Sequence, residues 1–237
     1  MNCKNCEAEV NQNYCSKCGH PVKLKRIDGN YIMNEIVQVL NFERGILFTI
    51  LELIIRPGEN IRNFISENRS RLVKPIMFII VTSLIYSLIN QIFQIEDSYI
   101  QYEEAEQSTI GIIFQWIQDH YGYANIIMGI FIAFWTKLFF RKYKYNFFEI
   151  LILLCFVMGI GMLIYSIFAL FQRLIDIDIM QIAGIAGFLY SAWAIGQFFD
   201  KSKFSNYAKA FFAYFLGFLT FTILAILLGT VIGLIIK

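Results

Sequence analysis

The sequence predicts an all-α polytopic membrane protein with about five transmembrane helices. Apolar runs of about 20 residues recur without charge, and this is the length that a helix needs to cross a bilayer. The chain of 237 residues is 57% hydrophobic and 16% charged, whereas ordinary soluble proteins carry about 25% charged residues. A soluble protein of this composition would expose too much apolar surface to stay in solution. These observations indicate an integral membrane protein.

Residues 1–26 form a small polar head in front of the apolar runs. The head carries two C-x-x-C pairs, Cys3 with Cys6 and Cys15 with Cys18, and four thiolates at this spacing suit a tetrahedral Zn²⁺ ion. Two disulfides are the alternative, but they need an oxidising compartment, and the start of the chain shows no signal peptide. We therefore expect a zinc ribbon whose metal is structural, since four cysteine ligands leave no open position for water.

Residues 27–74 are expected to bridge the head and the membrane domain with two amphipathic helices. The first, over residues 45–56, is too short to span a bilayer, so we expect it to lie in the cytoplasmic membrane interface. A Pro-Gly pair ends it, and a second short helix is expected over residues 59–68. These helices serve either as a platform for lipid or a partner, or as a cuff packed under the bundle. The apolar face of the first helix holds Ile46, Leu47, Ile50, Leu51 and Ile54, and its polar face holds Thr49, Glu52 and Arg56.

The stretch from residue 56 to residue 75 is rich in basic residues and leads into the first apolar run. It carries five Lys and Arg residues against two Glu residues. Basic residues beside a first span orient a polytopic protein and attract anionic lipid head groups. We expect contacts with lipid head groups from Arg56, Arg62, Arg69, Arg71 and Lys74.

The order of these motifs is two C-x-x-C pairs, an amphipathic run that ends in Pro-Gly, and a basic stretch before the first span. In this order the chain resembles a family of bacterial membrane proteins, common in Bacteroidota, that is catalogued as a domain of unknown function with an N-terminal zinc ribbon. The resemblance covers the first third of the chain in motif and the remainder in hydropathy. It implies the architecture and carries no activity. The matching positions are Cys3, Cys6, Cys15, Cys18, Gly19, Gly45, Thr49, Leu53, Pro57, Ile61, Arg69, Lys74 and Pro75.

Residues 75–237 are expected to form the transmembrane domain, with connections that alternate in charge. The connection over residues 96–122 has no Lys or Arg and six acidic residues, and the next connection is basic. Because cytoplasmic connections carry an excess of Lys and Arg, the N-terminus is expected in the cytoplasm and the C-terminus outside. We expect the bacterial cytoplasmic (inner) membrane as the location. The expected spans are residues 76–95, 123–140, 147–171, 179–199 and 208–236.

Transport or catalysis would place ionisable residues in the middle of a span. The apolar runs hold almost none there. Motifs such as HExxH, GxSxG and the Walker loop are absent, so we do not expect an enzyme. The adjacent amides of Asn90 and Gln91 are the most notable polar pair in a span. They either line a small cavity or cap neighbouring backbone, which is the commoner role.

Two functions of different classes fit this pattern. The first is a membrane adaptor or scaffold whose zinc ribbon docks an unidentified cytoplasmic protein, while the basic stretch holds the head against anionic lipid. The alternative is a carrier or scramblase of a lipid-like or apolar solute. Small residues spaced by four, such as Gly229 and Gly233, either pack within one bundle or form the face of a homo-oligomer. We do not expect nucleic acid as a partner, because the head is too short to form a groove-reading surface.

Overall fold

The computed structural model describes residues 9, 15–18, 45–93, 109–175 and 179–236. The chain divides into two compact units, residues 1–43 and residues 44–237. The larger unit therefore includes the second half of the expected bridge together with the apolar runs. Its regular elements within the described residues are all helices.

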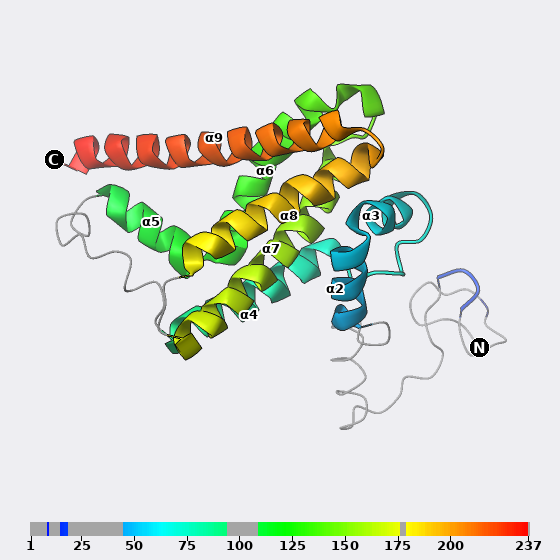
Figure 1. Ribbon diagram of the computed structural model, residues 1–237, viewed down its shortest axis with the longest axis horizontal. Coiled ribbons are helices and arrows are strands. Elements are labelled where there is room, and N and C mark those ends of the chain that lie inside the picture. Colours follow the sequence, from blue (N-terminus) through cyan, green and yellow to red (C-terminus); the bar gives the residue numbers. More distant parts are fainter. Residues whose placement is uncertain (1–8, 10–14, 19–44, 94–108, 176–178, 237) are drawn as a thin grey trace. The chain divides into compact units, whose positions relative to one another are not determined.

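Five of these helices are long and apolar enough to cross a membrane. This is a membrane protein, and the expected number of spans is confirmed. Each helix lies within a few residues of its expected position, and Figure 1 shows them packed into one bundle. The five helices are α4 (Pro75–Phe93), α6 (Tyr121–Phe139), α7 (Phe147–Ile175), α8 (Met180–Asp200) and α9 (Phe204–Ile236).

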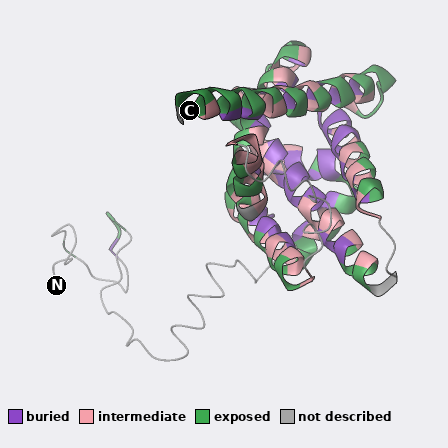
Figure 2. Cartoon of the chain, turned by 90° about the vertical axis from the view of Figure 1, so that its left-hand side faces the viewer, coloured by how far each residue is buried: buried purple, intermediate pink, exposed green. Residues whose placement is uncertain are grey.

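Helix α7 lies at the centre of the bundle and packs against α4, α6 and α8. Its side chains Leu153, Phe156 and Val157 are fully buried. Helix α9 differs from α7, because only 11% of its 18-residue apolar segment is buried, against 56% for the corresponding segment of α7. Figure 2 shows this contrast as a buried interior beside a largely exposed α9. An exposed apolar helix of this length suits contact with lipid on most of its surface.

Glycines let neighbouring spans approach closely. A Cβ on Gly217 of α9 would lie 2.5 Å from the Cα of Ile132 in α6. A Cβ on Gly159 of α7 would lie 2.6 Å from the ring of Phe78 in α4. These distances are too short for any side chain, so the small residues set the separation of the helices.

Helix α5 (Thr109–Asp119) packs along the second half of α9. A Cβ on Gly229 would lie 2.9 Å from the Cα of Ile110, and one on Gly233 would lie 2.9 Å from the hydroxyl oxygen of Thr109. Their spacing left two alternatives, packing within one bundle or the face of a homo-oligomer. The structure places α5 of the same chain against them, which supports packing within the bundle.

Two shorter helices, α2 (Ile46–Ile55) and α3 (Pro57–Ser66), precede the first span. Proline suits the first position of α3, because its missing N–H has no helical acceptor there and its φ is already helical. Ile61 and Phe64 of α3 are buried, and the Phe64 ring meets the Phe156 ring of α7 edge-on at 5.3 Å. Figure 1 shows α2 running across the direction of the long helices α4 and α7.

Two loops close the same end of the bundle. The 3₁₀ turn η3 (Arg141–Tyr143) lies between α6 and α7. The ring of Phe140 stacks on that of Phe199 with centroids 3.8 Å apart, and the Asn206 amide donates to the Tyr143 hydroxyl at 2.8 Å. Burial raises the pKa of the nearby Tyr145 phenol. The loop after α6 is therefore joined to the last turn of α8 and the first turn of α9.

Candidate functional site

A cavity of about 690 Å³ lies among the helices of the larger unit. All of α4 to α9 contribute to its wall. Among the described residues, its lining is mostly aromatic, thioether and glycine surface with a few amides and hydroxyls, and none of these lining residues is Asp, Glu, Lys, Arg or His. The lining residues are Tyr86, Phe114, Ile117, Gln118, Tyr121, Ala124, Asn125, Met128, Met158, Gly161, Met162, Tyr165, Met180, Gln181, Gly184, Gly187, Phe188, Ser191, Tyr214, Phe218, Phe221 and Thr222.

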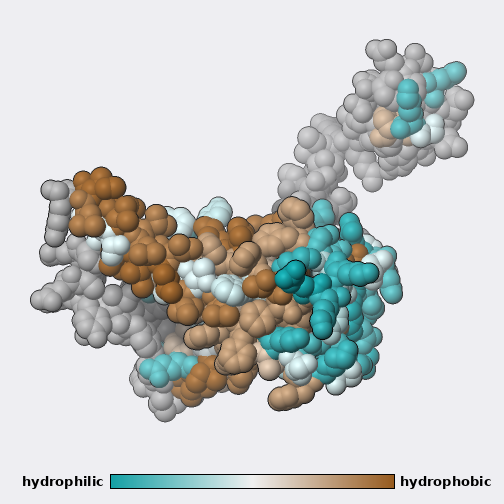
Figure 3. Space-filling view, turned by 90° about the horizontal axis from the view of Figure 1, so that it is seen from above, coloured by the Kyte–Doolittle hydropathy of each residue, from teal (hydrophilic) through white to brown (hydrophobic). Residues whose placement is uncertain are grey.

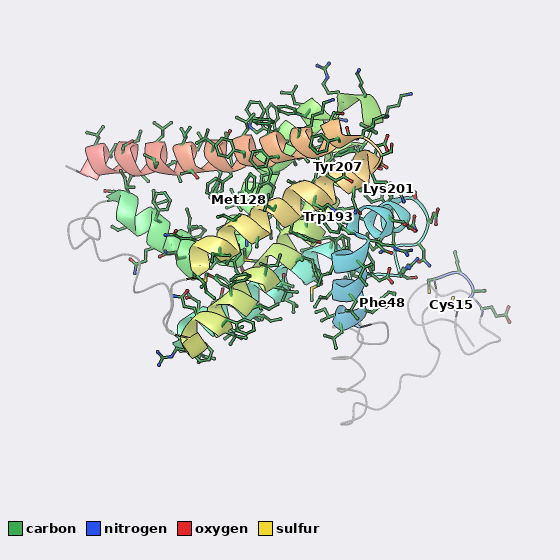
Figure 4. All side chains as sticks on the ribbon, viewed as in Figure 1. Cys15, Phe48, Met128, Trp193, Lys201 and Tyr207 are labelled. Atoms are coloured by element: carbon green, nitrogen blue, oxygen red, sulfur yellow. The ribbon has the colours of Figure 1, made fainter. Side chains whose placement is uncertain are left out.

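The cavity lies in the half of the bundle away from α3. Helix α6 lines it with its first half, between Tyr121 and Met128, and α8 with its first half, between Met180 and Ser191. Helix α3 instead contacts the last turn of α8. The cavity and the loop-covered end of the bundle are therefore separate regions of the protein. Figure 4 labels Met128, a residue of the cavity wall.

Asn125 is the polar residue that stands out in this wall. Its side chain is 3% exposed, and its amide Nδ2 has no hydrogen-bond partner. A buried donor without a partner costs about 1–3 kcal/mol. Such a group is rare in native structures and calls for an explanation. A ligand oxygen in the adjacent cavity would accept this bond.

The space itself results from glycines and methionines. A Cβ on Gly161 of α7 would meet no atom within 4 Å, so this position opens directly onto empty volume. Across the cavity, a Cβ on Gly187 would lie 3.4 Å from the Tyr165 ring. Thioether side chains adapt to irregular shapes and contact aromatic rings favourably. The lining includes four of them, from Met128, Met158, Met162 and Met180.

Asn90 and Gln91, the pair interpreted either as lining a small cavity or as capping neighbouring backbone, are not among the residues of this wall. Gln91 is exposed, and the Asn90 Oδ1 is buried without a hydrogen-bond partner. The sequence interpretation did not single out Asn125. The signal available was an amide in an apolar run, which both positions share.

On the other side of the bundle, polar contacts hold the polar face of α2. The backbone N–H of Val73 donates to the Thr49 hydroxyl at 3.1 Å, and Arg71 forms an ion pair with Glu52 at 3.2 Å. Thr49 and Leu53 are fully buried. The expected division of α2 into two faces is confirmed in part, but the face with Thr49 packs into the protein and the leucine face is exposed.

Helix α3 closes the C-terminal end of α8. The Nη1 of Arg62 donates to the carbonyl oxygens of Gln197 at 2.5 Å and Phe198 at 2.7 Å. The last carbonyls of a helix have no partner within the helix, so this guanidinium satisfies two of them. A Cβ on Gly58 would lie 2.4 Å from the carbonyl carbon of Gln197. Arg62 and Gly58 thus join α3 directly to the backbone of α8.

The five basic residues expected at lipid head groups fall into two sets. Arg62 and Arg71 have partners within the chain, as described above. Arg56, Arg69 and Lys74 are exposed.

The expected zinc ligands lie in the smaller unit. Cys3 and Cys6 are outside the described residues. Cys15 is buried, and the turn Ser16–Cys18 follows it, with Cys18 exposed. Among the described residues no cluster of three or more His, Cys, Asp or Glu could hold a metal ion. The zinc ribbon therefore stays a prediction.

Comparison with known families identifies one segment. Residues 43–87 match a family model described as a protein of unknown function (DUF3667). The match covers α2, α3 and most of α4, and it confirms the uncharacterised-family part of the resemblance. No curated protein and no solved structure matches the chain. Within the matched segment, Thr49, Leu53 and Ile61 carried the resemblance and are fully buried against the bundle.

Proposed function

We propose that this protein is a membrane carrier that binds a neutral, lipid-like molecule in the cavity among α4 to α9. The observation that carries the proposal is a cavity of about 690 Å³ with an apolar, aromatic wall and one buried amide donor without a partner. Pockets for small molecules have volumes of about 300–1,000 Å³, with mostly apolar walls and a few placed polar groups. The described wall offers mostly apolar binding surface, which supports carriage of an apolar ligand.

The lining limits the chemistry of the ligand. A charged head group needs an opposite charge or several hydrogen bonds when it leaves water, and none of the described lining residues is Asp, Glu, Lys, Arg or His. The ligand is therefore neutral. The unpaired Nδ2 of Asn125 needs an acceptor, which a carbonyl, ester or ether oxygen supplies. Rings and thioethers in the wall suit an apolar body.

The location is part of the proposal. The connections near α3 are basic, and such connections face the cytoplasm in bacterial inner-membrane proteins. This orientation places the zinc head in the cytoplasm, where its thiols stay reduced. It places the cavity in the outward half of the bundle and the C-terminus outside.

A direct binding experiment tests the cavity. The full chain is purified in detergent and titrated with fluorescent diacylglycerol, which is neutral, and with fluorescent phosphatidylglycerol, which is anionic. Asn125→Leu should weaken binding of the neutral probe by roughly tenfold, the loss of one buried hydrogen bond. Gly161→Leu should weaken it by placing a side chain in the space that Gly161 leaves open.

Asn90→Leu is the matched control, because Asn90 is also a partly buried amide in a span but does not line the cavity. It should bind the neutral probe like the wild type. Equal effects of Asn90→Leu and Asn125→Leu would contradict the assignment, and so would unchanged binding by Gly161→Leu. Tighter binding of the anionic probe than of the neutral one would overturn the proposed ligand class.

Movement of the ligand is a separate step. In liposomes that contain the protein, fluorescent diacylglycerol on the inner leaflet should reach the outer leaflet faster than in empty vesicles. Gly161→Leu should return the rate to that of empty vesicles. If wild type and empty vesicles give the same rate while binding persists, the protein binds this lipid without carrying it.

We also propose that the N-terminal unit acts as an adaptor for a cytoplasmic protein. The support is the spacing of the four cysteines together with the buried Cys15 that precedes the turn Ser16–Cys18. Native mass spectrometry of the full chain reads zinc, retained lipid and bound protein in one spectrum. One zinc per chain with a co-purifying protein supports the adaptor, and a chain without zinc removes its basis.

A further inference from the structure

Helix α2 exposes a continuous apolar face. The exposed fractions are 71% for Leu47, 60% for Leu51, 50% for Ile54 and 64% for Ile55. These positions are spaced by four or three, so they form one stripe along the helix. Ten residues extend only about 15 Å, so α2 cannot cross a bilayer. Side chains of this kind are not left in water without a reason.

The direction of this face is set by the opposite side of α2. Thr49 and Leu53 are buried, and the Leu53 carbonyl accepts a hydrogen bond from the Tyr190 hydroxyl of α8 at 3.0 Å. The side chain of Asn60 donates to the carbonyls of Glu52 and Arg56, both at 3.0 Å, and so holds the end of α2. The exposed face cannot turn inward without breaking these bonds. None of the described residues covers this face.

Charge around this end of the bundle identifies the partner. The segments 45–74, 137–149 and 200–209 contain twelve Lys and Arg and five Asp and Glu. At the opposite end, the described residues 86–93, 109–124, 165–175 and 179–190 contain one Arg, one Asp and one His. Figure 3 shows the hydrophilic side chains gathered mainly at one end of this unit and hydrophobic ones over the remaining surface in view. An apolar stripe within a basic surface is complementary to an anionic bilayer.

We infer that α2 lies in the head-group region of an anionic lipid leaflet. The side chains of Leu47, Leu51 and Ile55 enter the acyl boundary, as in other amphipathic interfacial helices. The exposed Arg56, Arg69 and Lys74 contact lipid phosphates. Helix α2 runs across the long helices, which is the direction of a membrane surface when those helices span it (Figure 1). Phe48, labelled in Figure 4, lies on this same helix.

Hydrogen–deuterium exchange in nanodiscs tests the inference on the full chain. The peptide that covers residues 46–56 should exchange more slowly in discs with phosphatidylglycerol than in discs of phosphatidylcholine alone. The triple variant Arg56→Gln, Arg69→Gln and Lys74→Gln should lose this difference. The matched control is Arg173→Gln, which removes a cation at the opposite end of the bundle and should keep it.

Lipid retention gives a second readout. In native mass spectrometry, each of the substitutions Arg56→Gln, Arg69→Gln and Lys74→Gln should lower retention of phosphatidylglycerol by on the order of fivefold. Leu51→Ser with Ile55→Ser should speed exchange of α2 in anionic discs without lowering the melting temperature in detergent, because both side chains are exposed in the fold. Equal exchange of wild-type α2 in the two kinds of disc would overturn the inference. Retention that falls equally in Arg173→Gln would also overturn it.

Discussion

Replacing Arg62 by Met is the sharpest test of how α3 is joined to the spanning helices. The Nη1 of Arg62 donates to two carbonyls in the last turn of α8, Gln197 at 2.5 Å and Phe198 at 2.7 Å. Other carbonyls of this turn have their own partners, since the Asn206 amide donates to Asp200 at 3.2 Å and the Tyr207 hydroxyl to Lys201 at 3.1 Å. Without Arg62, the carbonyls of Gln197 and Phe198 lose their donor.

The expected loss in the free energy of unfolding follows from these two hydrogen bonds. A hydrogen bond to a charged group contributes about 1.5–3 kcal/mol, and a cation at a helix C-terminus adds about 0.3–1 kcal/mol. The two bonds share one nitrogen and the side chain is half-buried, so their contributions do not add fully. We expect Arg62→Met to lower the free energy of unfolding by about 2–4 kcal/mol. Arg62→Lys should recover part of this, since an ammonium keeps the charge without the planar fork.

Thermal unfolding in detergent measures the loss, and hydrogen exchange locates it. The α8 peptide over residues 193–203 should exchange faster in Arg62→Met than in wild type. The matched control is Arg56→Met, because Arg56 is exposed and belongs to the same basic stretch. Its melting temperature should stay close to that of wild type. Equal melting temperatures for Arg62→Met and Arg56→Met would refute the assigned role of Arg62.

Three further changes test other contacts. Gly58→Ala should destabilise the bundle by about 1–3 kcal/mol, because its Cβ would lie 2.4 Å from the backbone of α8. The control Gly161→Ala should melt like wild type, because its Cβ meets nothing within 4 Å. Equal melting temperatures for the two variants would contradict the close approach of α3 to α8. Gly229→Leu should separate α5 from α9 and weaken binding of the fluorescent neutral lipid, and unchanged affinity would show that α5 is not a required wall of the cavity. Replacing Cys15 and Cys18 by Ser should abolish zinc binding, measured by elemental analysis, and leave the melting temperature of the larger unit unchanged. A lower melting temperature of the bundle in this variant would show that the two units are not independent.

The spans were predictable because their signal is local. A run of about 20 apolar residues crosses a bilayer as a helix whatever it packs against. The end of α2 was predictable for a similar reason, since Pro57 and Gly58 interrupt the helix, whereas α3 begins at Pro57 and not at residue 59 as expected. In the structure α4, α6, α7, α8 and α9 supply the five spans, and α2 and α3 are the two short helices.

The cavity was not predictable in this way. Asn90 and Asn125 are both amides in apolar runs, and nothing near either residue distinguishes them. Asn125 lines the cavity because of the rotation of α6 and the positions of five other helices around it. Small side chains such as Gly161 leave the space, but a glycine in a span more often marks a close contact, as Gly217 does here.

The amino-acid sequence by itself determined that this chain is a helical membrane protein, where its spans lie and which end of the bundle is basic. These properties depend on composition within about 20 residues and on transfer into lipid. Only the tertiary structure decided which residues have distinct contacts among those that look alike in the sequence. Arg62 differs from Arg56 because it meets carbonyls 135 and 136 residues away in the chain. Asn125 differs from Asn90 because it lines the cavity formed by six helices, whereas Asn90 does not. Such differences arise from contacts between distant segments, which no local pattern encodes.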